Sequence, residues 1–226
     1  GMMGKDICIQ GSKDIFYLAL EDRLKRSGIN ITSDANNAST TIGIDTNDEV
    51  DLLIIPKGSK NNNGRLIITI HDLIIPTGYS KWSPKDIYLL VEQIKNNEIN
   101  IIDESKIHYL VHIRDAIEAI STIVLSNNFH DSRGTMNICG RRAWSNESIF
   151  NEINMLWTRF HNSINYTHTT ESLSKIPSII KKNIRKNRER PNLDSLNKEL
   201  IRAGGDGWHP PTPLRTGLME LLAQNL

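Results

Sequence analysis

The turn Gly11-Ser12-Lys13-Asp14 lies between an apolar run and an amphipathic segment, a position at which a protein can hold a phosphate group. The apolar run at residues 5–10 predicts a buried strand, and the apolar spacing over residues 15–26 predicts a helix. Backbone N–H groups at the N-terminus of a helix attract anions. Asp34 follows a second predicted strand at residues 29–32, where its carboxylate could bind a ribose hydroxyl or simply form a turn.

Two further loops contain residues that could contact a ligand. Residues 57–64 follow a buried run at 51–56 and would lie where ligands bind in open α/β sheets. They lack the spacing of a phosphate loop, so a surface connection is the simpler interpretation. The loop Tyr79-Ser80-Lys81-Trp82 combines aromatic rings with a cation. Trp82 is a candidate contact for a base or sugar, and Tyr79 with Lys81 is a candidate acid–base pair, although loops also carry such residues by chance.

Histidines and a basic run complete the candidate groups. His108 and His112 are four residues apart in a predicted strand, which separates them by roughly 13 Å and prevents them from sharing a metal ion. No metal site is therefore predicted, and we interpret His112 as a structural histidine that ties the strand to the turn at Asp115. The basic run at residues 181–190 is either a solvated helix face or a phosphate-binding surface, because arginine binds phosphate oxygens bidentately.

The bulk composition narrows the class of protein. The chain has 226 residues, a formal net charge of +1 and 23% charged residues, which does not indicate nucleic acid or a membrane surface as a partner. Cys8 and Cys139 lie in apolar runs, so we expect buried free thiols in a reducing compartment. No apolar run approaches the roughly 18 residues that a membrane helix needs. These features predict a soluble cytoplasmic protein.

The order of the predicted elements defines the fold class. We expect a Rossmann-like, doubly wound α/β fold with a mostly parallel sheet, reduced in strand number, and a small, mainly helical C-terminal lobe. The core would occupy residues 1–157, with returning strands and helices at 99–145, and the lobe residues 158–226; one compact domain is the alternative. The further expected strands are 41–44, 65–70, 99–102, 107–113 and 134–140, and the further expected helices begin after the N-caps Ser83, Asp115, Ser145 and Thr212, with another near 194–202.

Three segments in the second half carry a family resemblance. They are Val111-His-Ile-Arg-Asp115, Met136-Asn-Ile-Cys-Gly140 and Gly207-Trp-His-Pro-Pro-Thr-Pro-Leu-Arg-Thr-Gly-Leu218. In this order they resemble the Val-His-Val-x-Asp strand, the Tyr-Asn-Ile-Gly strand and the closing Gly-Trp-x-Pro-x-Thr-x-Leu-x-x-Gly-Leu signature of the extended short-chain dehydrogenase/reductase family, specifically its nucleotide-sugar epimerases and dehydratases. The resemblance implies a Rossmann-like fold, NAD(P) as cofactor and a nucleotide sugar as substrate.

The resemblance also shows what this chain has replaced in the cofactor turn. In the family's Gly-x-x-Gly-x-x-Gly turn the first glycine makes the bend, the second admits the pyrophosphate, and the third lets helix and strand pack closely. Gly11 occupies the first place, but Asp14 and Tyr17 occupy the other two. The carboxylate of Asp14 would repel a pyrophosphate. The family resemblance therefore implies that NAD(P) binds through this turn and Asp34. Asp14 and Tyr17, at the second and third glycine places, argue against such binding.

The catalytic pair of the family is missing from the sequence. Family enzymes use Tyr-x-x-x-Lys, in which the lysine lowers the pKa of the tyrosine. The residues four places after Tyr17, Tyr79, Tyr88, Tyr109 and Tyr166 are Glu21, Ser83, Glu92, Ile113 and Thr170. Only residues 57–64 separate two strands between which the family has two long helices and a strand. That interval carries the catalytic pair and, in many relatives, the dimer interface, so the usual dimer is not implied, although a homo- or hetero-oligomer is left open.

The remaining implied contacts concern a nucleotide or nucleotide sugar. Relatives hold the diphosphate with an arginine upstream of the closing signature, and Arg190, followed by Pro191, looks like that position, with Arg188 as the alternative. Asp194 is similar to an acid that contacts the ribose. Three hypotheses follow: a non-catalytic member that binds a nucleotide sugar or a partner in nucleotide-sugar or polysaccharide metabolism, an active NAD(P)-dependent epimerase or dehydratase with a non-standard site, and a structural partner of a full-length relative.

Overall fold

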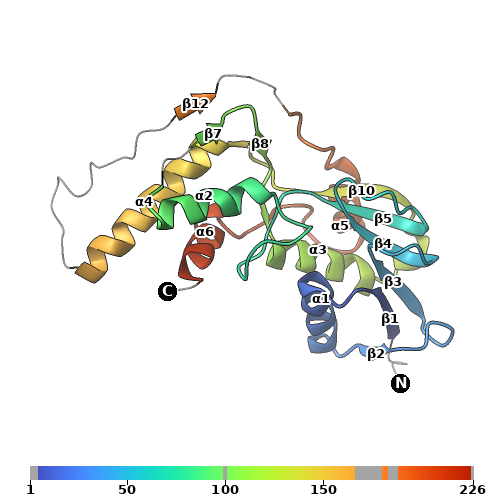
Figure 1. The fold of residues 1–226 in the computed structure, drawn as a ribbon. Coiled ribbons are helices and arrows are strands. Elements are labelled where there is room, and N and C mark those ends of the chain that lie inside the picture. The colour runs from blue at the N-terminus through green and yellow to red at the C-terminus, as the bar shows by residue number, and fades with distance from the viewer. Residues whose placement is uncertain (1–4, 99–100, 166–179, 183–187, 225–226) are drawn as a thin grey trace. The chain divides into compact units, whose positions relative to one another are not determined.

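The computed structural model describes residues 5–98, 101–165, 180–182 and 188–224 (Figure 1). The chain divides into two compact units, each assembled from three separate stretches. Unit 1 comprises Gly1–His71, Ile113–Cys139 and Pro191–Pro211, and unit 2 comprises Asp72–His112, Gly140–Arg190 and Thr212–Leu226. Each unit therefore draws on both sides of residue 157, where the sequence suggested a division.

Unit 1 contains a six-stranded sheet in the order β10-β5-β4-β3-β1-β2, in which every neighbouring pair is parallel. This arrangement confirms the predicted Rossmann-like α/β class with a mostly parallel sheet. The strands are β1 (Asp6–Gly11), β2 (Asn30–Thr32), β3 (Thr40–Ile44), β4 (Val50–Pro56), β5 (Gly64–Ile70) and β10 (Gly134–Ile138).

One face of this sheet is a continuous apolar layer. The strand register aligns buried side chains in rows, of which two consist of Ile9, Ile42, Leu52 and Leu66, and of Ile44, Ile54, Ile68 and Met136. The helices of unit 1 are α1 (Ile15–Arg26), α3 (Ile113–Leu125) and α5 (Asp194–Arg202). They lie side by side, α1 next to β1 and α3, and α5 next to α3 and β10. Their apolar residues complete the core of the unit.

The connections β3–β4 and β4–β5 are unusually short. Parallel neighbours generally need a crossover of a dozen or more residues. Here residues 45–49 and 57–63 make the two connections, and no helix lies between Thr40 and Ile70, a stretch described throughout. Each connection must return along the length of a strand, and a strand such as β4 spans roughly 20 Å. A fully extended segment as long as residues 45–49 or 57–63 can just cover this distance. Residues 57–63 are therefore the surface connection that the sequence favoured.

Polar side chains tie these two connections to each other. Asp45 has a φ of 47°, and its Oδ1 accepts hydrogen bonds from Ser59 Oγ at 2.6 Å and from Asn61 Nδ2 at 3.0 Å. Asn63 Nδ2 donates to the carbonyl oxygen of Asn47 at 2.7 Å. The asparagine-rich composition of this region thus has a structural use, because side-chain amides connect one short loop to the other.

Unit 2 is mainly helical. Its helices α2 (Lys85–Lys95), α4 (Asn146–Asn165) and α6 (Leu214–Ala223) pack around a core that includes Ile87, Leu90, Phe150, Ile153 and Leu218 (Figure 1). Short strand pairs complete it: β6 (Leu73–Ile74) with β9 (Val111–His112), β8 (Ile107–His108) with β11 (Trp144–Ser145), and β7 (Ile101–Asp103) with β12 (Ile180–Lys182). None of the described helices is long and apolar enough to cross a bilayer.

Several element boundaries differ from the predictions. The single strand expected at 107–113 is two short strands, because α3 already begins at Ile113 and places Asp115 inside its first turn. Pro84 precedes α2 as N-cap, and Ser83 Oγ instead accepts a hydrogen bond from Tyr88 Oη at 3.2 Å. Pro213, rather than the expected Thr212, precedes α6. Ser145 does act as a cap for α4, since its Oγ accepts a hydrogen bond from Ser148 N at 3.1 Å.

Candidate functional site

The cofactor-type turn at the carboxyl end of β1 needs its glycine for a reason internal to the protein. Gly11 has a φ of 114°, a conformation that residues with a Cβ rarely adopt. A Cβ at this position would overlap the carbonyl oxygen of Ile44, the last residue of the neighbouring strand β3. Gly11 therefore permits the close approach of β1 and β3, and its presence does not require a ligand.

The N-terminus of α1 carries the protein's own anion. Asp14 is the N-cap, and its carboxylate accepts a hydrogen bond from Tyr17 N at 3.0 Å. Tyr17 is 5% exposed and donates from its hydroxyl to the carbonyl oxygen of Ile9 at 3.2 Å; burial raises the pKa of Tyr17. Both residues at the replaced glycine positions thus stabilise the β1–α1 junction. A carboxylate thus occupies the helix terminus at which the family's turn receives a pyrophosphate.

The other predicted cofactor residues lie on the surface of unit 1. Ser12 and Lys13 are exposed, and Lys13 Nζ lies 6.0 Å from the ring centroid of Tyr17. Asp34 is also exposed and accepts hydrogen bonds from Asn36 N at 3.0 Å and Asn37 Nδ2 at 2.5 Å. This is the turn-forming role that the sequence left open for Asp34. A ribose contact of Asp34 stays a prediction.

A cluster of buried and half-buried charged side chains, not anticipated from the sequence, lies in unit 2. Asp72 follows β5 and is 8% exposed. Its Oδ2 accepts hydrogen bonds from Tyr109 N at 2.7 Å and from Arg188 Nη1 at 2.6 Å. His108 Nδ1 lies 3.7 Å from Asp72 Oδ1, a distance too long for a hydrogen bond but short enough for a strong charge interaction.

The opposite edge of the His108 ring faces a second carboxylate. His108 Nε2 lies 2.9 Å from Asp86 Oδ2 and 3.0 Å from Asn146 Oδ1. Asn146 Nδ2 also donates to Asp86 Oδ2 at 2.9 Å, and Lys106 Nζ lies 3.9 Å from the same oxygen. We call Asp72, Asp86, His108, Asn146 and Arg188 the His108 cluster. Its members come from five separate parts of unit 2. These are the segment just after β5, helix α2, strand β8, the start of α4 and the segment at residue 188.

The charges in the His108 cluster hold each other in the ionised form. Burial alone would lower the pKa of His108, but Asp72 and Asp86 outweigh it and raise that pKa to about 9. Burial alone would raise the pKa of Asp86, but His108, Asn146 and Lys106 lower it to about 2. A general acid or base works best with a pKa near the working pH. The cluster is therefore suited to holding unit 2 together rather than to proton transfer at neutral pH.

The predicted substrate residues have different surroundings. Arg188, proposed from the family for a diphosphate, is bound to Asp72 and also donates to the carbonyl oxygen of Ile107 at 3.4 Å. Arg190 is exposed, and its Nη1 donates to the carbonyl oxygen of Arg141 at 3.3 Å. Asp194 is exposed at the first position of α5 in unit 1, where its N–H donates to Asn192 Oδ1 at 2.8 Å.

The loop at 79–82 does not present an open aromatic platform at Trp82. Trp82 is 2% exposed and belongs to the core, with Lys81 Nζ 5.5 Å from its ring centroid. Tyr79 is 57% exposed, and its ring lies edge-on to that of Tyr88 with 5.8 Å between centroids. Of the two aromatic candidates in this loop, Tyr79 therefore has the accessible ring, and its acid–base role with Lys81 stays a prediction.

The remaining histidine and cysteine predictions have clear outcomes. His112 Nε2 lies within hydrogen-bond distance of Glu220 Oε2, at 3.1 Å, so its side-chain partner is on α6, while its own strand pairs with β6. Cys8 and Cys139 are buried free cysteines, as predicted. Among the described residues no group of three or more histidine, cysteine, aspartate or glutamate side chains could hold a metal ion.

Comparisons with known proteins support the fold. No model of a protein family matches the chain, and no curated protein sequence matches it either. Solved structures do match: RMD from Pseudomonas aeruginosa complexed with NADPH has a TM-score of 0.59 at 8% identity, with 98% of this chain and 97% of that chain covered. UDP-glucose 4-epimerase from Thermus thermophilus in complex with NAD has a TM-score of 0.56 at 8% identity, with 96% and 97% covered.

A third structure, the dTDP-glucose 4,6-dehydratase from Bacillus anthracis in complex with NAD, has a TM-score of 0.57 at 8% identity, with 97% of this chain and 96% of that chain covered. Identities this low establish the fold and not the chemistry. The chain therefore has the fold of the NAD-dependent sugar epimerases and dehydratases. The resemblance inferred from the three sequence segments is confirmed at that level.

Proposed function

We propose that this chain is a shortened relative of the epimerases and dehydratases that does not transfer hydride and instead binds a nucleotide sugar or a partner protein in nucleotide-sugar or polysaccharide metabolism. The observation that carries the proposal is the carboxylate of Asp14, which caps α1 through Tyr17 N. Two further observations support it: the sequence has no Tyr-x-x-x-Lys pair, and residues 57–63 between β4 and β5, all of them described, form no helix that could carry one.

The cost of placing a pyrophosphate at α1 can be estimated. Two like charges about 4 Å apart repel by about 4 kcal/mol at the effective dielectric constant of a protein surface. A penalty of this size weakens binding by roughly a thousandfold. Moving Asp14 away would leave α1 without its cap, which costs about another 1 kcal/mol. We therefore expect the dissociation constant of this chain for NAD(P) to be far higher than that of enzymes with this fold that bind the cofactor.

Calorimetric titration with NAD+, NADH, NADP+ and NADPH tests the cofactor half of the proposal. The expected result is no saturable heat up to about 1 mM ligand. Asp14→Ser is the informative variant, because serine keeps the cap but removes the charge. Micromolar binding by the unchanged protein would contradict the proposal and favour an active enzyme, for which loss of turnover in Tyr79→Phe would then be the next expectation.

Saturation-transfer NMR with UDP-glucose, dTDP-glucose and GDP-mannose tests the ligand half. Transfer to the sugar or base protons of at least one compound is expected, and Arg190→Ala should weaken it, because an exposed guanidinium is the remaining diphosphate contact implied by the family. If none of the three compounds binds, the nucleotide-sugar role is wrong. A protein partner would remain, and co-purification with a full-length relative would test it.

A further inference from the structure

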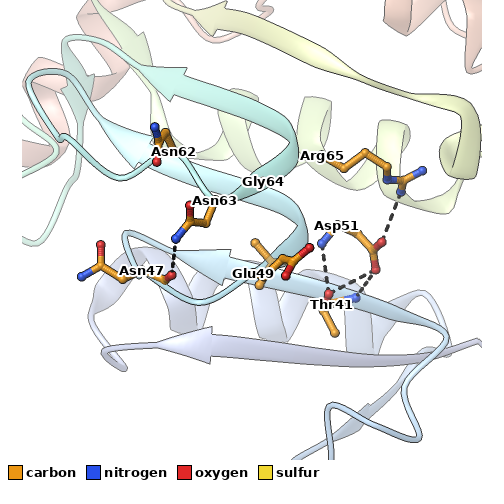
Figure 2. Close-up of a pocket in the computed structure, with 9 residues that line it drawn as sticks. Thr41, Asn47, Glu49, Asp51, Asn62, Asn63, Gly64 and Arg65 are labelled. Atoms are coloured by element: carbon orange, nitrogen blue, oxygen red, sulfur yellow. Dashed lines mark hydrogen bonds and ion pairs between the residues drawn. The ribbon is translucent and has the colours of Figure 1, made fainter.

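A polar hollow of about 820 Å³ lies in unit 1 (Figure 2), within the size range of small-molecule sites. Its walls come from the amino ends of β4 and β5, from Thr41 on β3, and from the two short connections. Ligands of open α/β sheets bind at the carboxyl ends of the strands. The hollow lies at the other edge of the sheet, so it is distinct from the nucleotide position considered above.

One half of the hollow is held in place by hydrogen bonds (Figure 2). Asp51 Oδ2 accepts from Thr41 N at 2.8 Å and from Thr41 Oγ1 at 3.1 Å, while Asp51 N donates to Thr41 Oγ1 at 3.0 Å. Arg65 Nη2 lies 3.6 Å from Asp51 Oδ1. The guanidinium of Arg65 also lies 5.1 Å from the ring centroid of Phe129, and its Nη1 donates to the carbonyl oxygen of His130. These side chains are pre-positioned on strands.

The other half of the hollow is available for binding. The side chains of Asn47, Glu49 and Asn62 line it, are exposed and make no hydrogen bond to any described residue. Asn63 uses its Nδ2 for the carbonyl oxygen of Asn47 and leaves its Oδ1 without a described partner. The hollow therefore offers both donors and acceptors on an exposed wall that faces a fixed wall.

The chemistry of the lining selects a ligand class. Val50 is the one apolar side chain among the lining residues, so an apolar ligand gains little. The lining contains two carboxylates, Glu49 and Asp51, and one guanidinium, Arg65, so the hollow has a negative balance that disfavours phosphates and carboxylates. Amides, carboxylates and a guanidinium together match hydroxyl groups, each of which both donates and accepts. The geometry points to a binding site for a neutral saccharide of one or two rings.

Nitrogen-15 NMR titration of the full chain tests this site directly. The probes are methyl α-D-glucopyranoside and maltose, titrated up to about 50 mM so that a Kd in the millimolar range, about −4 kcal/mol of binding free energy, can be measured. The side-chain amide signals of Asn47, Asn62 and Asn63 and the Arg65 Nε signal should shift saturably. Absence of these shifts with both sugars would overturn the inference. Glucose 6-phosphate should bind at least several-fold more weakly, and equal or tighter binding would contradict the charge argument.

Substitutions at two exposed asparagines test where the sugar binds, and neither is expected to unfold the protein. Asn62→Ala removes one hydrogen-bonding side chain and should weaken sugar binding by roughly threefold to tenfold. Asn96→Ala is the matched control, because Asn96 is an exposed asparagine of unit 2. Equal binding by the two variants would show that the sugar does not occupy the hollow. The outcome is independent of the nucleotide-sugar experiments, since those compounds are expected to bind through Arg190 and a free sugar is not.

Discussion

Replacing His108 by glutamine should lower the free energy of unfolding by about 3 kcal/mol near neutral pH. His108 is 6% exposed and lies between the carboxylates of Asp72 and Asp86. Glutamine preserves the volume and one hydrogen bond but removes the positive charge. The buried carboxylate of Asp72 and the half-buried carboxylate of Asp86 would then share only the charges of Arg188 and Lys106, and removing one partner of a buried ion pair typically costs about 3–5 kcal/mol.

The same substitution should change the pH dependence of stability. The pKa of His108 rises from its ordinary 6.5 in the unfolded chain to about 9 in the folded protein. The native state therefore holds this proton more tightly, and its contribution is complete below pH 6.5 and lost as the pH rises through 9. That difference in pKa corresponds to about 3 kcal/mol, and the pKa of about 2 for Asp86 reports largely the same pair, so the two values are not added.

Urea unfolding followed by tryptophan fluorescence at about pH 6, 7.5 and 9.5 measures this effect. Three of the four tryptophans, Trp82, Trp144 and Trp157, belong to unit 2 and report on the cluster. His130→Gln serves as the control, since the His130 side chain is 75% exposed and should leave the alkaline loss unchanged. If His108→Gln and the unchanged protein lose the same stability between about pH 6 and 9.5, the charged state assigned to His108 is wrong.

Gly11→Ala should destabilise unit 1 by about 4 kcal/mol. The φ of 114° is unfavourable for alanine, which costs roughly 1–2 kcal/mol, and the overlap of the new Cβ with the carbonyl oxygen of Ile44 adds about 1–3 kcal/mol. Backbone oxygen atoms of a central strand cannot move aside as a flexible side chain can. The loss should appear without any cofactor, because the requirement for glycine is the close approach of β1 to β3.

Gly28→Ala separates the two causes. Gly28 also has a positive φ, of 79°, but a Cβ there would meet nothing within 4 Å. The cost should therefore be only about 1 kcal/mol, from the backbone conformation alone. The difference between the two variants, measured by urea unfolding of the protein alone, reports the strand contact. If both variants lose the same free energy of unfolding, the close contact with Ile44 is not the reason that position 11 requires glycine.

Local patterns in the sequence predicted the elements of unit 1 well. Helix α1 begins at Ile15 and ends at Arg26, as predicted, because its apolar residues recur at helical spacing and a glycine follows its end. The predicted bounds of β4 and β5 also match the structure closely. Short runs of β-branched and leucine residues between polar loops are typical of buried parallel strands. Helix α5 agrees at both ends.

The sequence could not reveal the His108 cluster. Its members come from the residues after β5, from α2, β8 and α4, and from a segment near residue 188, so no local spacing connects them. The four-residue spacing of His108 and His112 gives no information on the carboxylates that face His108. The family resemblance pointed to Arg188 as an alternative diphosphate contact, whereas its pairing with Asp72 depends on the tertiary fold.

The short connections between β3, β4 and β5 also bear on the order in which the sheet assembles. The entropy lost on closing a loop grows with the logarithm of its length. Pairing these three strands requires closing only residues 45–49 and 57–63, whereas pairing β5 with β10 must close residues 71–133. The low contact order of residues 40–70 favours early pairing of β3, β4 and β5. The centre of this parallel sheet can therefore form before the edge strand β10 pairs with β5.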